Sequence, residues 1–468
     1  VRLRLSAAAV VDRLDTLSQY ARALLLGPHE PVEAPIRAEL FGAQRFAQHG
    51  HSLARAQVVQ SADARGDGHP FFPRVDKNLD SLRSAYDYIA LISRSGRYVS
   101  PAAEWLLDNF HLVEAQLQQI REGVPRRYYA RLPKLAVPPL AGLPRVYGIA
   151  WAYVAHTDSV LNKTLFTAFL DAYQDIDELT LGELWALPTT LRVVLLENLR
   201  RVAESIAENK VAREVAHAAW DAADSLSSHE LDVLYRALQS RGMQDSYLTQ
   251  LWQRLPVEQG EHPPALVKWC EQHCPNGPAL IADAQSAQAA ANLTVGNIIT
   301  TLRMIGQVDW ADLIEPVSRS LRVLRELPSF GHESELTRQQ ITQAMEQVAR
   351  STRKPEREVA QAVVGLALPA RGSEAERTAG YHLFGAGRPG LVAALAPARS
   401  DGRAAALPRR RPPANWRLAL YLAAIASGTS ALLAAAVHGL HRIGWPDAGW
   451  TSVVALVLLA WPLSEAVI

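Results

Sequence analysis

Residues 180–208 read TLGELWALPTTLRVVLLENLRRVAESIAE and predict a long helix. Thr180 and Glu183 open it at the spacing of a capping box, in which the threonine hydroxyl and the glutamate carboxylate each satisfy a free amide of the first turn. Pro188 lies one turn further on and predicts a bend, because proline removes a helical hydrogen bond. We expect the helix to run through to residue 208.

A second helix is well marked at 101–122. Ser100 is an N-cap residue, and Pro101 suits the first helical position. Apolar residues then recur at helical spacing until Gly123 and Pro125, which end the segment.

The remaining pattern is also helical, with no alternation of polar and apolar residues that would predict a sheet. Two segments are expected to be irregular, namely the loop HPFFPRVDKN at 69–78 and the proline-rich crossing 125–144. Amphipathic helices are expected at 146–176, 210–250, 280–325 and 332–351. The predicted fold class is all-α, a multi-helix cytoplasmic region followed by two transmembrane helices.

Composition limits the function classes. The chain has 468 residues, of which 48 are basic and 47 acidic, giving a formal net charge of +1. A nucleic-acid-binding surface needs clustered excess Lys and Arg, so we expect no nucleic-acid partner. The only cysteines, Cys270 and Cys274, flank His273 in WCEQHC. Thiolate and imidazole bind zinc, but no second Cys/His cluster completes four ligands, so a reduced structural pair is preferred.

Two membrane spans are predicted near the C-terminal end. Residues 418–437 read LALYLAAIASGTSALLAAAV, 20 residues without charge, which matches the length that a helix needs to cross a bilayer core of about 30 Å. Residues 450–468 begin a second and weaker span, because Pro462 and Glu465 lie within it.

Composition divides the chain into five segments. They are an N-terminal helical segment (1–95), a helical cytoplasmic region of one or more domains (96–395), a Pro/Arg-rich linker (396–415), the first span (418–437) and a second span that the chain cuts short (450–468).

Arginine placement predicts the orientation of the spans. Arg442 is the only Lys or Arg between the two spans. Five arginines lie shortly before the first span: Arg403, Arg409, Arg410, Arg411 and Arg417. Positive residues stay on the cytoplasmic side. We therefore expect residues 1–415 in the cytoplasm and the loop near Gly444 outside. The opening VRLRLSAAAVVDRL has too short an apolar run for a secretory signal.

Arg126, Arg127, Tyr128 and Tyr129 are the candidate binding residues. Arginine recognises phosphate and aromatic rings stack on sugars, so the four together suit a phosphate or a sugar ring. The alternative, which the sequence favours, is a buried tether for the proline-rich crossing. No catalytic residue, metal site or cofactor is predicted within the chain.

Asp175-Ile176-Asp177 forms a D-x-D. In nucleotide-sugar transferases such a pair holds a divalent cation that neutralises the diphosphate. That role needs a rigid loop at a strand end, and no strand precedes this triplet. We expect solvated acids at a helix end instead.

Glu104, Asp108 and His111 share one face of the 101–122 helix. A di-metal site would need further Glu-x-x-His partners, for which the segment 156–158 is a weak candidate. A structural polar network between helices is the expected role.

Several stretches resemble the N-terminal region of cyclic β-1,2-glucan synthases. Weaker similarity lies at 305–328 and 376–395, whereas 332–341 and 396–415 depart from the family's pattern. The specific stretches are AAEWLLDNFHLVEAQLQQIREGVPRRYYARLPKL (102–135), GLPRVYGIAWAYVAHTDS (142–159) and LTLGELWALPTTLRVVLLENLRRVAE (179–204).

The resemblance implies a longer protein of the bacterial inner membrane. In this family a helical cytoplasmic region and two spans precede a processive glycosyltransferase domain that uses UDP-glucose and a divalent cation. Cyclising and phosphorylase-like domains follow, and the glucan grows on a protein tyrosine. The implied partners are the downstream transferase domain, the lipid bilayer and, as a candidate, β-1,2-glucan. No motif of the transferase domain has a counterpart here.

Three functions are consistent with the sequence. The first is a scaffold that positions the downstream transferase. The second is a binding module that holds glucan or UDP-glucose through the four candidate residues. The third is an unrelated membrane-anchored helical adaptor, which the reading frame beyond Ile468 would distinguish from the first.

Overall fold

The computed structural model describes residues 7–27, 33–60, 71–255, 264–396 and 438. The described residues up to Ala396 belong to one compact unit, which we call the first unit. The predicted spans 418–437 and 450–468, and all of the predicted linker except Ala396, lie outside the described residues. Within the part that the structure describes, no helix combines the length and the apolar character of a membrane span.

The described residues of the first unit are helical, without a β-strand; two isolated β-bridges join Val59 to Leu135 and Lys134 to Pro144. The larger group of helices comprises α1 (Ala7–Asp12), α2 (Gln19–Leu26), α3 (Ala43–Ala56), α4 (Phe71–Arg94), α5 (Pro101–Gly123), α6 (Arg126–Tyr129), α7 (Arg145–His156), α8 (Lys163–Gln174), α9 (Leu181–Asp221), α10 (Ser228–Gln239), α11 (Gln244–Arg254), α12 (Pro264–His273), α13 (Gly277–Ile305) and α14 (Trp310–Val317). A smaller group follows: α15 (Arg319–Leu324), η1 (Phe330–His332), α16 (Glu335–Thr352), α17 (Glu356–Ala367), η2 (Glu374–Arg377), α18 (Ala379–Leu383) and α19 (Arg388–Leu395). The all-α prediction is confirmed for these residues.

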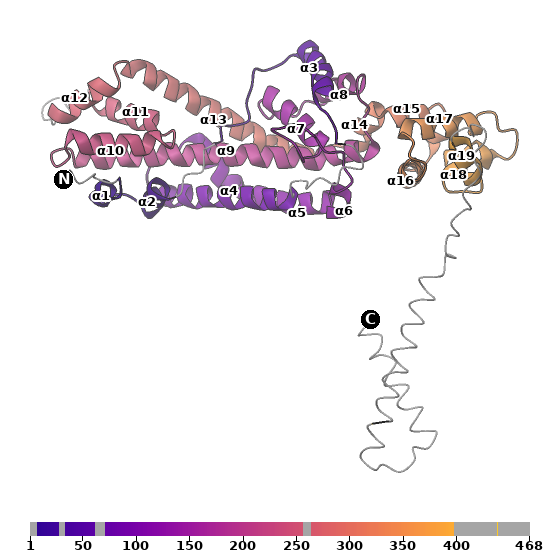
Figure 1. Cartoon of the computed structure of the whole chain (residues 1–468), viewed down its shortest axis with the longest axis horizontal. Coiled ribbons are helices and arrows are strands. Elements are labelled where there is room, and N and C mark those ends of the chain that lie inside the picture. The colour runs from indigo at the N-terminus through magenta and orange to yellow at the C-terminus, as the bar shows by residue number, and fades with distance from the viewer. Residues whose placement is uncertain (1–6, 28–32, 61–70, 256–263, 397–437, 439–468) are drawn as a thin grey trace, which may run out of the picture. The chain divides into compact units, whose positions relative to one another are not determined.

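Helix α9 is the central element of the unit. It runs for 41 residues through Pro188 and begins at the predicted capping box, in which Thr180 and Glu183 bond reciprocally. Helices α4 and α5 pack along one side of α9, and α11 and α13 along another (Figure 1). The first of the predicted helices is therefore the one around which the others assemble.

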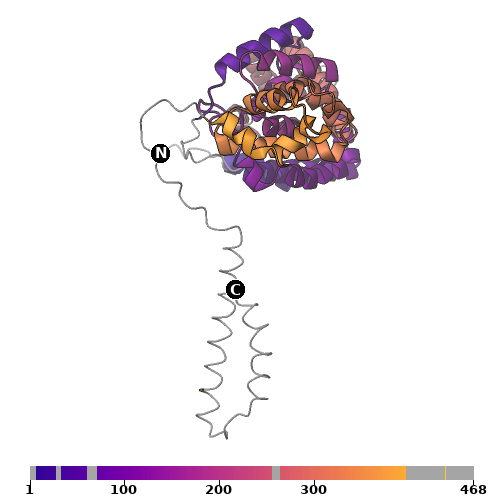
Figure 2. The ribbon, with the colours of Figure 1, turned by 90° about the vertical axis from the view of Figure 1, so that its right-hand side faces the viewer.

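Two hydrophobic cores meet at the start of α9. The larger runs from Val10 to Val317, so residues of both predicted segments, 1–95 and 96–395, contribute to it. The smaller core contains Leu181 together with buried residues of α15–α19. Trp185 packs against both cores. Figure 2 looks at the unit from the end where α15–α19 lie.

The predicted loop at 69–78 is wrong from residue 71 onward, because α4 begins at Phe71. Pro73 lies in the first turn, where a missing amide costs nothing since that amide has no helical partner. Val75, Leu79 and Leu82 then recur at helical spacing, and all three are buried. The buried face of the helix outweighs the polar residues between them.

The predicted helix at 146–176 is interrupted. The structure has α7 and α8 with a connection between them, in which Asp158 and Ser159 adopt positive φ angles of 47° and 69°. Asp158 accepts hydrogen bonds from Thr294 and Asn297 of α13, at 2.7 and 3.2 Å from the respective side chains. These contacts from a distant helix stabilise a left-handed backbone that sequence periodicity does not reveal.

Helix α5 ends at Gly123. Thr189 of α9 occupies the space that a side chain at this position would need. A Cβ atom built at Gly123 would lie 2.3 Å from the Thr189 hydroxyl oxygen but 3.5 Å from the Thr189 Cβ. We expect Gly123→Ala to lower the free energy of unfolding by about 1–3 kcal/mol, because the contact is overpacked. In a Thr189→Ala background the same change should cost much less. Urea unfolding of the wild type, the two single variants and the double variant measures this. An equal cost of Gly123→Ala in both backgrounds would contradict a clash with Thr189.

Candidate functional site

The four candidate binding residues lie on α6 but do not converge. Arg126 and Arg127 are exposed, whereas Tyr129 is buried, with the Lys134 ammonium 5.5 Å from its ring centre. Tyr128 is half-buried, and its hydroxyl donates a hydrogen bond to the Gly182 carbonyl at the start of α9. Tyr129 thus has the position of a tether, whereas Tyr128 lines a cavity.

That cavity, which we name the Tyr128 groove, has a volume of about 640 Å³. One wall consists of Tyr128, Gly182 and Trp185, from α6 and the first turns of α9. Leu321 and Phe330 form an apolar floor that belongs to the smaller core. The size falls within the ~300–1,000 Å³ of typical ligand pockets.

Helix α16 supplies the opposite wall of the Tyr128 groove. Two rows of side chains, each spaced by four residues, face it: Glu335, Gln339, Gln343 and Gln347 in one row, and Arg338, Thr342, Glu346 and Arg350 in the other. Residues four apart lie on one face of a helix. The apolar face of α16, with Ile341, Met345 and Val348, packs into the smaller core. Burial of that face leaves the amide-rich face turned to the groove.

Charge in the Tyr128 groove is balanced, because three arginines and three glutamates line it. Two of the arginines are already paired: Arg338 lies 3.4 Å from the carboxylate of Glu315, and Arg350 forms an ion pair with Glu346. Glu315 also binds Arg325, 2.9 Å away. The groove therefore carries no net charge that would favour a strongly charged ligand.

Glu356 joins α17 to α9 close to the Tyr128 groove. Its carboxylate accepts a hydrogen bond from the Leu181 amide at 2.7 Å. Burial, and then the charges of Glu346 and Glu183, raise the pKa of Glu356 to about 7, although the Leu181 amide and Arg350 act in the opposite direction. The ionised form is thus disfavoured in the folded protein near neutral pH.

A pH-dependent gain in stability is expected for Glu356→Gln. A carboxyl whose folded pKa is raised stabilises the fold below its unfolded value of 4.5, and this contribution is lost as the pH rises toward 7. Glutamine keeps the acceptor for Leu181 without a charge. At about pH 8 the variant should be more stable by up to about 3 kcal/mol, with no gain at about pH 4.

Urea unfolding at both pH values measures this effect. The control is Glu358→Gln on the same helix, because Glu358 is exposed and pairs with Lys354 at 2.8 Å. Its effect should stay within about 0.5 kcal/mol at either pH. A gain for the Glu356 variant that is equal at both pH values would contradict the raised pKa.

The two aspartates of the D-x-D bind arginines. Asp175 lies 2.5 Å from Arg319, with His51 at 3.4 Å on its other side. Asp177 forms an ion pair with Arg145. Both residues follow α8, as the helix-end interpretation predicts, but they are ion-paired rather than simply solvated. Among the described residues no cluster of three or more His, Cys, Asp or Glu side chains is placed to hold a metal ion.

Cys270 and Cys274 lie in the larger core as free thiols. Burial raises the pKa of Cys270 to about 12, with smaller contributions from Cys274 and Glu271. A thiol that stays protonated is a poor metal ligand. His273 stacks on Trp269 with ring centres 4.1 Å apart, so its ring also serves packing.

Glu104, Asp108 and His111 are all exposed along α5. The expected polar network between helices does not describe them, because these side chains lie on the solvent face. The polar residues that α5 turns inward are different: Gln116 accepts a hydrogen bond from Arg192 at 2.9 Å, and Asn109 accepts one from Arg303. His156 instead packs on Phe41, with ring centres 3.8 Å apart.

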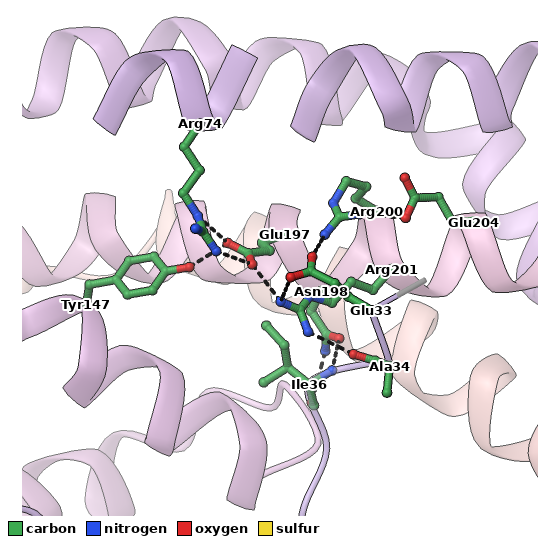
Figure 3. Close-up of polar contacts among 10 residues, drawn as sticks. All are labelled: Glu33, Ala34, Ile36, Arg74, Tyr147, Glu197, Asn198, Arg200, Arg201 and Glu204. Carbon is green, nitrogen blue, oxygen red and sulfur yellow. Dashed lines mark hydrogen bonds and ion pairs between the residues drawn. The ribbon is translucent and has the colours of Figure 1, made fainter. Parts of the chain in front are cut away.

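A buried polar network on α9 was not predicted from the sequence (Figure 3). At its centre is Glu197, which has no exposed surface. Its carboxylate accepts hydrogen bonds from Arg74 at 2.8 Å, from Arg201 at 2.8 Å and from the Tyr147 hydroxyl. Although burial opposes ionisation, the hydrogen bonds and charge of Arg74, with those of Tyr147 and Arg201, hold the pKa of Glu197 below its ordinary value. The network joins α4, α7 and α9.

The same region of α9 binds the segment around residues 33–36. Glu33 forms ion pairs with Arg200 and Arg201, and Asn198 accepts a hydrogen bond from the Ile36 amide at 2.7 Å (Figure 3). Most of these polar groups meet a protein partner, although Glu33 is exposed and the Nε atoms of Arg200 and Arg201 are buried without a hydrogen-bond partner among the described residues. The ion pairs and hydrogen bonds hold this segment against α9.

A second buried ion pair lies beside the Tyr128 groove. Arg145, which is 4% exposed, contacts both oxygens of Glu183 at 2.8 and 2.7 Å. Glu183 also completes the capping box of α9. The pair is bidentate, the geometry in which guanidinium and carboxylate bind most strongly. It joins the start of α7 to the start of α9.

Comparison with known proteins gives one informative similarity. No protein-family model matches the chain. A stretch of 316 residues, 65% of this chain, is 33% identical to cyclic beta-(1,2)-glucan synthase NdvB of Rhizobium meliloti (strain 1021). This chain is related to that synthase. It spans only 11% of the length of that much longer relative.

The stretches that resemble cyclic β-1,2-glucan synthases pack against one another. Tyr128 of the first binds Gly182 of the third, and Arg145 and Tyr147 of the second bind Glu183 and Glu197 of the third. Segments far apart in the sequence thus form one connected set of contacts around the first half of α9. The resemblance to the synthase therefore concerns a structural centre of the unit.

Proposed function

We propose that this chain is the N-terminal helical and membrane-anchoring region of a cyclic β-1,2-glucan synthase. In this role it scaffolds a downstream glycosyltransferase that uses UDP-glucose. The observation that carries the proposal is the 33% identity with the Rhizobium meliloti enzyme over 316 residues. The chain itself contributes no catalytic residue, and UDP-glucose and the divalent cation belong to the downstream domain.

The buried ion pairs support a scaffolding role. Breaking a buried pair is costly, so such pairs hold their helices in one arrangement. Here the Arg145–Glu183 pair and the Glu197 network join α4, α7 and α9. A scaffold needs this fixed geometry, because a transferase domain can be positioned only by a rigid support.

An activity assay on the chain alone tests the scaffold proposal. The chain is expressed and incubated with labelled UDP-glucose and Mg²⁺, and release of UDP or formation of glucan is measured. We expect neither, and robust turnover would contradict the proposal. The coding sequence beyond Ile468 is a second test. A transferase domain is expected there, and a stop codon would favour the membrane-anchored adaptor.

The membrane topology is a further prediction. A reporter that is active only in the periplasm should be active when it is fused after Gly444 and silent when it is fused after Leu407. The reason is that arginines gather before the first predicted span, whereas only Arg442 follows it. Periplasmic activity of the Leu407 fusion would show that the orientation is wrong. It would also remove the scaffold proposal, because UDP-glucose is a cytoplasmic substrate.

The second candidate function is a binding module. The observation that favours it is the Tyr128 groove, to which one of the four candidate residues contributes. In this proposal the groove holds the glucan and not UDP-glucose, because its charges are balanced and a diphosphate requires an excess of cations.

A further inference from the structure

The Tyr128 groove combines aromatic and amide surfaces on facing walls. Trp185 and Tyr128 lie on one wall, and both are half-buried, so part of each ring remains open. Gln339, Gln343 and Gln347 are exposed on the other wall. A pyranose ring has an apolar face that packs on aromatic rings and a rim of hydroxyls. The two walls match these two surfaces.

Glutamine amides suit hydroxyl ligands because each carries two donors and an acceptor. Within the described residues, Gln339 has a hydrogen bond to Glu335 at 3.3 Å, and none is recorded for Gln343 or Gln347. Their spacing of four residues is one turn, a rise of about 6 Å along the helix. A ligand that repeats its hydroxyls along its length can use both amides together.

The Tyr128 groove also holds a donor without an acceptor. The Nε atom of Arg338 is buried and has no hydrogen-bond partner among the described residues, although the guanidinium contacts Glu315. A ligand oxygen would satisfy this donor. With the guanidinium already paired to a carboxylate, a neutral hydroxyl or ether oxygen suits this donor better than a second anion.

We infer that the Tyr128 groove binds a neutral oligosaccharide, namely a short segment of β-linked glucan. The neutral, hydroxyl-rich chemistry follows from the groove itself. The choice of β-1,2-linked glucose rests on the proposed function. The groove holds the sugar chain by stacking on Trp185 and Tyr128 and by hydrogen bonds to Gln343 and Gln347, and no covalent step takes place there.

Calorimetric titration of the whole chain with a linear β-1,2-gluco-oligosaccharide tests the inference. We expect saturable binding at millimolar ligand or below. Gln343→Ala combined with Gln347→Ala should weaken it about tenfold, because two hydrogen bonds to neutral groups are lost. Both side chains are exposed, so the variant should fold normally, which far-UV circular dichroism checks.

The matched control is Gln340→Ala. Gln340 is an exposed glutamine of the same helix that does not line the groove, and its replacement should leave the affinity unchanged. No saturable heat with the folded wild-type chain would overturn the inference, and so would equal affinity of the double variant. Displacement of the oligosaccharide by UDP-glucose would overturn the assignment to a neutral ligand. Equal binding of an α-1,4-linked glucan would overturn the assignment to β-linked chains.

Oligosaccharide binding by the groove and scaffolding of the transferase can be measured separately. A chimera in which this chain replaces the aligned region of the Rhizobium meliloti synthase reports on scaffolding by its glucan synthesis. If the chimera makes glucan while the chain alone binds no oligosaccharide, the groove inference fails and the scaffold stands. If the chain binds oligosaccharide but itself turns over UDP-glucose, the scaffold proposal fails and the groove inference stands.

Discussion

Glu183→Ala is expected to lower the free energy of unfolding of the helical unit by about 3–5 kcal/mol, because it removes one partner of a buried ion pair. Arg145, which is 4% exposed in the wild type, would keep Asp177 and the Glu178 carbonyl as partners. The same change removes half of the capping box that begins α9. Urea unfolding followed by far-UV circular dichroism measures the loss.

The double variant Arg145→Met and Glu183→Met distinguishes the cost of an unpaired buried charge from the cost of lost packing. Replacing both charges with apolar side chains removes the stranded cation, so the double variant should be more stable than Glu183→Ala. A loss below about 1 kcal/mol for Glu183→Ala would contradict the view that this pair joins α7 to α9.

Glu197→Ala is the second change for which a loss of about 3–5 kcal/mol is expected. Three groups from three helices depend on this carboxylate: Arg74 of α4, Tyr147 of α7 and Arg201 of α9 itself. Its removal takes the carboxylate away from these three donors and opens a cavity, although Arg201 retains Glu33. The same unfolding measurement checks this, with intrinsic fluorescence as a second probe.

Glu204→Ala is the matched control, since Glu204 lies two turns further along α9 and pairs with Arg200, which retains Glu33. Its cost should be about 1 kcal/mol or less.

The pKa of Glu197 is lowered in the fold, so its contribution is present above the unfolded value of 4.5 and is lost as the pH falls. The difference in free energy of unfolding between Glu197→Ala and the wild type should therefore shrink in acid. A difference that grows in acid would contradict the lowered pKa of Glu197.

Capping motifs in the sequence predicted where two of the main helices begin. The capping box of Thr180 and Glu183 gave the correct start of α9, and Ser100 with Pro101 gave the correct start of α5. The error at 146–176 arose where distant contacts decide. The turn at Asp158 and Ser159 is stabilised by α13, more than 100 residues further along the chain.

The site residues were harder to predict for the same reason. Arg145 and Glu183 are 38 residues apart, and nothing local marks them as a pair. The glutamines of α16 look like a solvated helix surface until the fold places Trp185 and Tyr128 opposite them. The sequence places Tyr128 in an aromatic-basic cluster, but its neighbours Arg126 and Arg127 do not line the groove that Tyr128 lines.

Synthesis of β-1,2-glucan from labelled UDP-glucose by the chimera tests the scaffold proposal most directly. This chain replaces the aligned N-terminal region of the Rhizobium meliloti synthase, with and without Glu197→Ala. We predict that the intact chimera makes glucan, and that the Glu197→Ala chimera reaches the membrane in equal amount but makes little, because its support has lost its fixed structure. Equal glucan synthesis by the two chimeras, with the helical unit of the variant shown to be unfolded by limited proteolysis, would contradict the scaffold proposal.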